Sequence, residues 1–129
     1  MENKTMTALI YKGIKDIALL ERDIPVCGPD DVVVQNIRSG ICGSDVGAYL
    51  YGTMASGIFP NKEFGHEMAG IIHKTGENVI DIKKGSRVWV NPTTAVLDPW
   101  DSDMAGAFSQ YAVVHNAKLN YNIYPLPDD

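Results

Sequence analysis

The stretch Gly65–Val79, GHEMAGIIHKTGENV, decides how the rest of this 129-residue chain is interpreted. His66 and Glu67 are adjacent in it, and an imidazole beside a carboxylate is a candidate metal site or acid/base pair by chemistry alone. Its glycines indicate a backbone that turns tightly or is closely approached. They stand at Gly65, Gly70 and Gly76. The intervening apolar residues predict a strand over Glu67–Lys74.

A second stretch lies upstream, at Gly40–Asp45, GICGSD, and holds a cysteine between glycines. Cys42 and His66 offer the sulfur and nitrogen ligands that Zn²⁺ prefers. Taken alone, Cys42 could equally be a small buried apolar residue, and His66 a hydrogen-bonded core histidine. The two stretches together favour a metal site.

The residues after Cys42 predict a short helix over Asp45–Tyr51. Ser44 could cap its N-terminus, and Gly52 would end it. Asp45 would then lie in the first turn, where a carboxylate is favoured by the helix dipole. These structural roles for Ser44 and Asp45 are compatible with roles in a functional site.

Composition limits the class of protein. Apolar residues make up 45% of the chain, which is typical of one folded domain rather than of disorder. The net charge of −5 does not suggest a nucleic-acid partner, and no apolar run approaches the roughly 18 residues of a membrane span. The N-terminus has no signal-peptide pattern. Cys27 and Cys42 are therefore predicted to be free thiols in a cytoplasmic protein.

Short apolar runs separated by turn residues predict a mainly-β fold, a barrel or sandwich of mostly antiparallel strands. The predicted strands are Met6–Tyr11, Ile17–Arg22, Asp31–Arg38, Glu67–Lys74, Ser86–Val90, Ala107–Val114 and Asn120–Tyr124. Lys12–Gly13 is predicted as the turn of a first hairpin, and Thr53–Phe64 and Thr93–Ala107 as loops. No G-x-G-x-x-G motif follows a strand, so no dinucleotide-binding unit is predicted.

On these motifs the chain resembles the zinc-containing medium-chain alcohol dehydrogenase family. The family's G-H-E signature is matched by Gly65, His66, Glu67, Gly70, Gly76 and Val79, and its G-x-C-G-[ST]-D pattern by Gly40, Cys42, Gly43, Ser44 and Asp45. The resemblance implies that residues 1–129 form the family's N-terminal GroES-like catalytic domain. This is a distorted β-barrel with one or two short helices. The Rossmann coenzyme domain is expected to be absent from this chain, as in a truncated product.

The resemblance also implies roles for individual residues. Cys42 and His66 would bind zinc, a third ligand would come from the following domain, and Glu67 would approach the metal when water leaves. Ser44 would hydrogen-bond the substrate oxygen and relay its proton. Asp45 would orient His66.

Two departures from the family pattern matter. Many relatives have a histidine for proton relay where this chain has Gly47, which favours the polyol or sugar-phosphate branch over simple alcohols. The four cysteines of a structural zinc lobe are missing from Thr93–Ala107, so one zinc is expected, not two.

The sequence is therefore consistent with two functions. The first is the zinc-binding catalytic domain of an NAD(P)-dependent alcohol or polyol dehydrogenase. It would use zinc, take NAD or NADP only through the missing domain, and be inactive alone, so whether this chain is itself an enzyme stays open. The alternative is a stand-alone GroES-like interaction module with a vestigial metal site, which could form a homodimer. A zinc-free reductase of the same superfamily is disfavoured by Cys42 and His66.

Several residues outside these motifs are expected to have ordinary structural roles. Cys27 is expected to be an inert thiol, and His73 and His115 to be surface or core residues on strands. Four aromatic residues could line a substrate cleft or simply pack in the core. They are Tyr49, Tyr51, Phe59 and Trp100.

Overall fold

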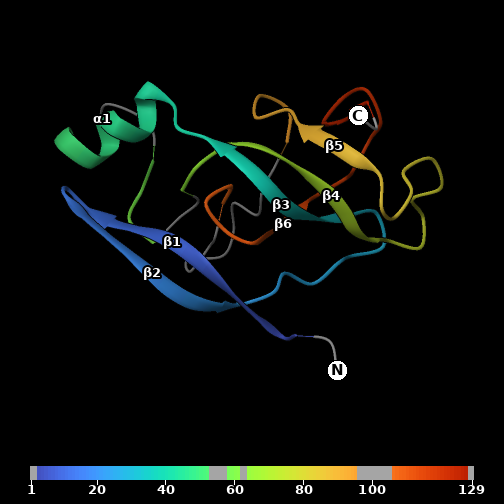
Figure 1. Ribbon diagram of the computed structural model, residues 1–129, viewed down its shortest axis with the longest axis horizontal. Helices are drawn as coiled ribbons and strands as arrows, with labels where there is room; N and C mark the ends of the chain where they lie inside the picture. Colours follow the sequence, from blue (N-terminus) through green and yellow to red (C-terminus); the bar gives the residue numbers. More distant parts are fainter. Residues whose placement is uncertain (1–2, 53–57, 62–63, 96–105, 128–129) are drawn as a thin grey trace.

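The computed structural model describes residues 3–52, 58–61, 64–95 and 106–127 (Figure 1). The described strands are β1 (Thr5–Gly13), β2 (Asp16–Asp23), β3 (Val32–Gly40), β4 (Glu67–Thr75), β5 (Arg87–Val90), β6 (Tyr111–Val114) and β7 (Ile123–Pro125). The one described helix is α1 (Gly43–Tyr51). These elements confirm the predicted mainly-β fold with a short helix.

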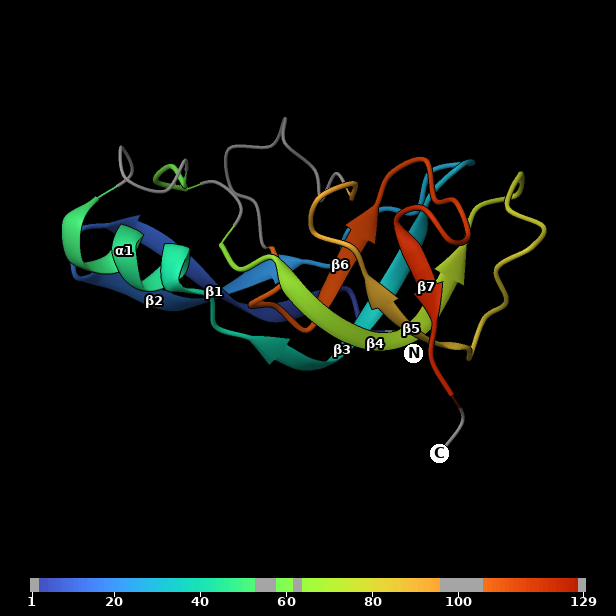
Figure 2. The ribbon, with the colours of Figure 1, turned by 90° about the horizontal axis from the view of Figure 1, so that it is seen from above.

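The strands form two sheets, and every pairing within them is antiparallel. One sheet is the β1–β2 hairpin; the other has the order β6-β3-β4-β5-β7. Among the described residues, an isolated bridge joins Ala8 of β1 to Ser109, two positions before β6. Over the described residues the two sheets do not close into a barrel. Figure 2 shows α1 and the hairpin at one end of the molecule and the five-stranded sheet at the other.

One face of the five-stranded sheet supplies the main core. Alternate residues of β3 and its neighbours point to this face and are almost fully buried, as at Val32, Val34 and Ile72. Burying an aliphatic side chain of this size contributes about 1.5–3 kcal/mol. A smaller cluster of Tyr11, Ala48 and Phe64 fixes α1 to the hairpin.

The glycines of the central stretch have the packing reasons that the sequence suggested. A Cβ on Gly70 would lie 2.0 Å from the carbonyl oxygen of Gln35 on β3. A Cβ on Gly76 would lie 2.2 Å from the carbonyl oxygens of Gly28 and Pro29. Both distances are far below contact, so a side chain at either position would force the backbones apart.

Two local predictions were wrong. The hairpin turn lies at residues 14–15, not at Lys12–Gly13, because β1 continues through a bulge and Lys15 adopts the left-handed conformation (φ 55°). The predicted strand Ala107–Val114 pairs with β3 only from Tyr111 onward. Its first half instead meets β1, where the Leu9 amide donates to the Phe108 carbonyl at 2.7 Å.

Parts of the two predicted loops, and Trp100 with them, lie outside the described residues. Among the residues that are described, no helix is long and apolar enough to cross a membrane.

Candidate metal centre

Cys42 lies at the N-cap of α1, directly after β3. Its backbone is extended (φ −88°, ψ 155°), and its carbonyl accepts the Asp45 amide at 3.0 Å. In return, Oδ2 of the Asp45 carboxylate accepts a hydrogen bond from the Cys42 amide at 2.9 Å. This reciprocal pair caps the helix. The prediction that Ser44 is the cap was therefore wrong, since the helix begins at Gly43.

The pairing of β3 with β4 brings His66 and Glu67 close to Cys42. Gly40 at the end of β3 pairs with Glu67 at the start of β4, so the residues just beyond these ends are neighbours. Gly65 turns the chain into β4 with a positive φ of 80°. The Phe108 ring occupies the space where a Cβ on Gly65 would lie, at 2.6 Å. Only glycine satisfies both conditions.

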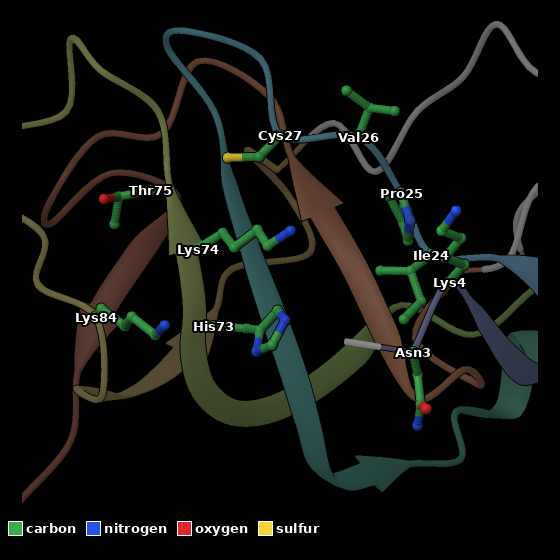
Figure 3. A pocket seen from close by; sticks show the side chains of 10 residues that line it. All are labelled: Asn3, Lys4, Ile24, Pro25, Val26, Cys27, His73, Lys74, Thr75 and Lys84. Atoms are coloured by element: carbon green, nitrogen blue, oxygen red, sulfur yellow. The ribbon is translucent and has the colours of Figure 1, made fainter. Parts of the chain in front are cut away.

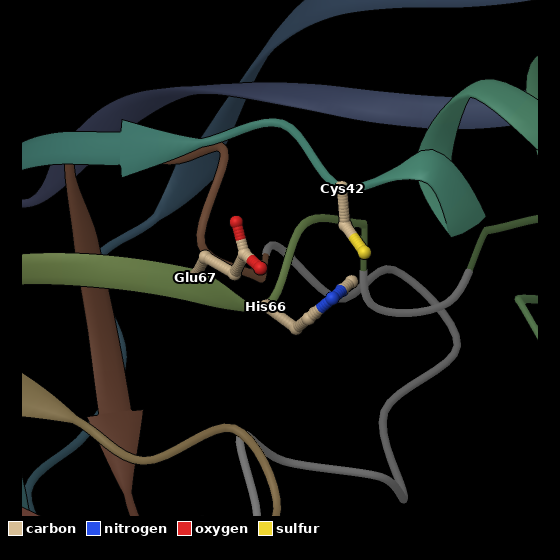
Figure 4. A group of neighbouring side chains, drawn as sticks. All are labelled: Cys42, His66 and Glu67. Atoms are coloured by element: carbon tan, nitrogen blue, oxygen red, sulfur yellow. The ribbon is translucent and has the colours of Figure 1, made fainter.

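Cys42, His66 and Glu67 bring a sulfur, a ring nitrogen and a carboxylate oxygen within 4.8 Å of one another (Figure 4). All three residues are half-buried. No other group of three such ligand residues is found within the described ranges. Thiolate, imidazole and carboxylate form a donor set suited to Zn²⁺.

Glu67 is placed by the glycine opposite it. A Cβ on Gly40 would lie 2.4 Å from the Glu67 carboxylate and 3.2 Å from its Cβ. The Glu67 side chain therefore lies across Gly40, beside the centre. This gives the first glycine of the GICGSD stretch a function in the site that the sequence alone did not reveal.

Asp45 carries an unsatisfied polar atom. The residue is 2% exposed, and its Oδ1 has no hydrogen-bond partner among the described residues. This oxygen lies 3.6 Å from Nδ1 of His66. A small movement of the imidazole would form the bond, place a proton on Nδ1 and leave the Nε2 lone pair free for a metal. The residues present therefore fit a bound zinc ion.

The surroundings of Cys42 favour its thiolate form. Its pKa is lowered, chiefly by the hydrogen bond from the Ser44 side chain, then by the Ser44 backbone and by His66. Burial and the Glu67 carboxylate oppose this shift in pKa. The thiolate is the form that binds metals, so these hydrogen bonds favour a ligand at Cys42.

The structure thus brings together all the residues that the sequence singled out for the site. Cys42, His66 and Glu67 form the cluster, Asp45 lies beside His66, and Ser44 contacts Cys42. Asp45 as the capping partner of Cys42 was missed. The signal was present, because an acidic residue three positions after an N-cap is the capping-box spacing.

Comparison with known proteins gives one family match: the model of the alcohol dehydrogenase GroES-like domain matches residues 28–128. An L-threonine 3-dehydrogenase from Caldanaerobacter subterraneus subsp. tengcongensis is 39% identical over 85 residues, covering 64% of this chain and 24% of that protein. The sorbitol dehydrogenase of Mus musculus is 38% identical over 86 residues, covering 66% and 24%.

Among solved structures, a short chain alcohol dehydrogenase from E. coli CFT073, complexed with NADH, superimposes with a TM-score of 0.75 at 26% identity. The match covers 98% of this chain and 40% of that one. The chain spans about a quarter of the length of the two dehydrogenases matched by sequence.

Proposed function

Because the chain belongs to the alcohol dehydrogenase GroES-like domain family, we propose that it is the zinc-bearing catalytic domain of an NAD(P)-dependent alcohol or polyol dehydrogenase. The observation that carries this proposal is the Cys42–His66–Glu67 cluster, with Oδ1 of Asp45 3.6 Å from Nδ1 of His66. In this proposal residues 1–129 hold the metal, and the nicotinamide coenzyme binds elsewhere in the complete protein.

Zinc, when bound, would supply a Lewis acid that makes an alcohol oxygen easier to deprotonate. Cys42 and His66 would hold it through Sγ and Nε2. Glu67 lies close enough to contribute its carboxylate or to leave that position to water or substrate. The half-buried Ser44 hydroxyl, next to Cys42, would take the proton from the substrate hydroxyl and pass it to water.

Asp45 acts in this proposal as a positioning residue. Its carboxylate is fixed at Oδ2 by the Cys42 amide, so Oδ1 has a set direction toward His66. A hydrogen bond from Nδ1 to that oxygen would hold the ring and make Nε2 a better ligand.

The proposed substrates are small alcohols, polyols or sugar phosphates. The sorbitol dehydrogenase relative supports the polyol class. Gly47, half-buried in α1, offers no imidazole for a second proton-relay step, so the proton would leave through water or the coenzyme ribose.

Since hydride transfer needs the coenzyme, we expect no turnover by these residues alone. We also propose a cytoplasmic location, which the two free thiols support.

Metal analysis by plasma mass spectrometry tests the centre directly. The purified chain should carry about one zinc, as a single catalytic-type site would. Cys42→Ala and His66→Ala should each lose it, whereas Cys27→Ala and His73→Ala should retain it. Equal zinc in all five proteins would contradict the proposed ligands. Cobalt substitution adds an independent readout, because a cysteine ligand produces a thiolate-to-metal absorption band that Cys42→Ala must abolish.

The alternative of an interaction module is favoured by one apolar surface. A groove of about 290 Å³ lies between α1 and the hairpin and is lined mainly by apolar side chains, among them Ile17, Ile41 and Val46. Leu19 on β2 is 71% exposed, and no described strand pairs with the outer edge of β2. Under this alternative the chain forms a homodimer with no specific metal. Light scattering after size exclusion, with and without zinc, separates the two: a zinc-free dimer supports the module, and a zinc-bearing monomer opposes it.

A further inference from the structure

A cleft separate from the groove beside α1 has a basic lining, although the net charge of the chain is −5. We call it the basic cleft. It has a volume of about 750 Å³, which is the size of a small-molecule site. Figure 3 shows it between the first described residues, the segment after β2 and the end of β4. None of the residues of the candidate metal centre lines it.

Four basic side chains from three separate segments line this cleft. They are Lys4, His73, Lys74 and Lys84. Asn3 and Thr75 add an amide and a hydroxyl, and no aspartate or glutamate is among the lining residues. Three of the chain's eight lysines thus meet at a wall without a carboxylate of its own.

Three consecutive residues of β4 line the cleft, His73, Lys74 and Thr75, and a β-bulge explains how the first two do so together. Successive side chains of a regular strand point to opposite faces. Here Val33 pairs with Lys74 and Val34 with Ile72, so His73 is the extra residue of the bulge. Bulges redirect side chains in this way. Figure 3 shows His73 and Lys74 extending to the same side, and the His73 ring lies 4.8 Å from the ring of Tyr111.

Asp31 does not line the cleft, but it acts on one residue of the cleft wall. Asp31 acts electrostatically on Cys27 in the cleft wall and, after burial, is the main cause that raises the pKa of this thiol. Its two oxygens also accept hydrogen bonds from Nδ1 of His115 at 3.0 Å and from the Asn116 amide at 3.1 Å. The remaining wall is apolar and comprises Ile24, Pro25 and Val26.

We propose that this cleft binds a small phosphorylated metabolite. Its phosphate would lie beside His73 and among the lysines, whose ammonium groups donate charge-assisted hydrogen bonds. Its carbon skeleton would contact the apolar wall at Ile24–Val26. The proposal rests on the cleft alone and holds whether or not the metal centre is catalytic.

Calorimetric titration of the metal-free chain with inorganic pyrophosphate tests the site, at constant ionic strength set with KCl. We expect saturable binding of one pyrophosphate per chain. Lys4→Gln and Lys84→Gln should each weaken it about three- to tenfold, since each removes a hydrogen bond from a charged group. Lys83→Gln is the matched control, because Lys83 is adjacent to Lys84 and is also exposed but does not line the cleft. Its affinity should equal that of the unmodified chain.

Three results would overturn the proposal. The first is no saturable binding. The second is an equal loss of affinity in Lys83→Gln, which would mean that only the general charge of the surface matters. The third is tighter binding of citrate than of pyrophosphate, which would assign the cleft to carboxylates. Because the titration needs neither zinc nor turnover, its failure is distinct from a failure of the proposed dehydrogenase function.

Discussion

At the scale of single residues, the candidate centre depends on one buried carboxylate with two different tasks. Oδ2 of Asp45 caps α1 at Cys42, and Oδ1 faces His66 with no hydrogen-bond partner in the described part of the chain. The two tasks can be separated by substitution. An asparagine keeps an oxygen for the cap but removes the charge that faces the imidazole.

Asp45→Asn should weaken zinc binding about tenfold or more, since partners that orient a ligating histidine have effects of this size. Competition with a chromophoric chelator measures the affinity. Asp16→Asn is the control, because Asp16 is exposed on β2 and far along the chain from the centre. Unchanged zinc affinity in Asp45→Asn would show that the oxygen has no part in metal binding.

The two cysteines should differ in reactivity for a stated reason. Hydrogen bonds from Ser44 and His66 lower the pKa of Cys42, whereas burial and Asp31 raise the pKa of Cys27. Near pH 7 more of Cys42 is thiolate, and the thiolate is the nucleophile. In metal-free protein, iodoacetamide should therefore modify Cys42 first, and the difference should shrink as the pH rises above the pKa of Cys27. Peptide mass spectrometry over time measures both rates; faster labelling of Cys27 at pH 7 would contradict the assignment.

At the scale of elements, the pairing of β3 with β4 positions both the candidate metal centre and the basic cleft. The start of β4 places Glu67 beside Gly40, and the bulge near its end directs His73 and Lys74 to the basic cleft. Gly70, between them, lies against the Gln35 carbonyl, which keeps the two strands in contact. A single strand pair thus carries the geometry of two separate sites.

Substituting glycines at two positions should have opposite effects. Gly70→Ala should destabilise the fold by about 1–3 kcal/mol, because overpacking forces backbone shifts. Gly47→Ala should stabilise it by about 0.5–1 kcal/mol, because Gly47 lies within α1 and nothing stands within 4 Å of a Cβ there. Urea unfolding followed by circular dichroism measures both. Similar midpoints for the two variants would show that the close approach at Gly70 is unimportant.

At the scale of the whole molecule, one carboxylate joins segments distant in sequence. Asp31, just before β3, accepts hydrogen bonds from His115 and the Asn116 amide, just after β6. Its side chain is 15% exposed. The contact therefore ties the residues after β6 to the residue before β3, 84 positions away along the chain.

Asp31→Ala should lower the free energy of unfolding by about 1–3 kcal/mol, because it leaves the Asn116 amide and His115 without this acceptor. Thermal and urea unfolding both measure the loss. The exposed Asp23 of β2 offers a control, and Asp23→Ala should change stability by less than about 0.5 kcal/mol. A loss equal to that of the control would mean that the contact contributes nothing to the fold.

Local patterns in the amino-acid sequence were enough to predict the fold class, most strand positions and the residues of the candidate centre. The strands follow from alternating apolar residues and from the turn residues between them. The candidate centre follows from a cysteine and a histidine, each placed next to glycines at fixed spacing. The close approach at Gly70 was also foreseeable, because a glycine inside a strand often marks a place where another backbone comes near.

The remaining features depend on how distant segments pair in the folded chain. The meeting of Cys42 with His66 is a consequence of strand pairing between Gly40 and Glu67, which are 27 positions apart. The basic cleft combines Lys4, His73 and Lys84, and no spacing in the sequence relates them. The N-cap of α1 is Cys42 rather than Ser44 because the Asp45 carboxylate accepts a hydrogen bond from the Cys42 amide. The sequence by itself determines which ligand or charge each side chain offers. The pairing of distant strands decides which of these side chains lie close enough to act together.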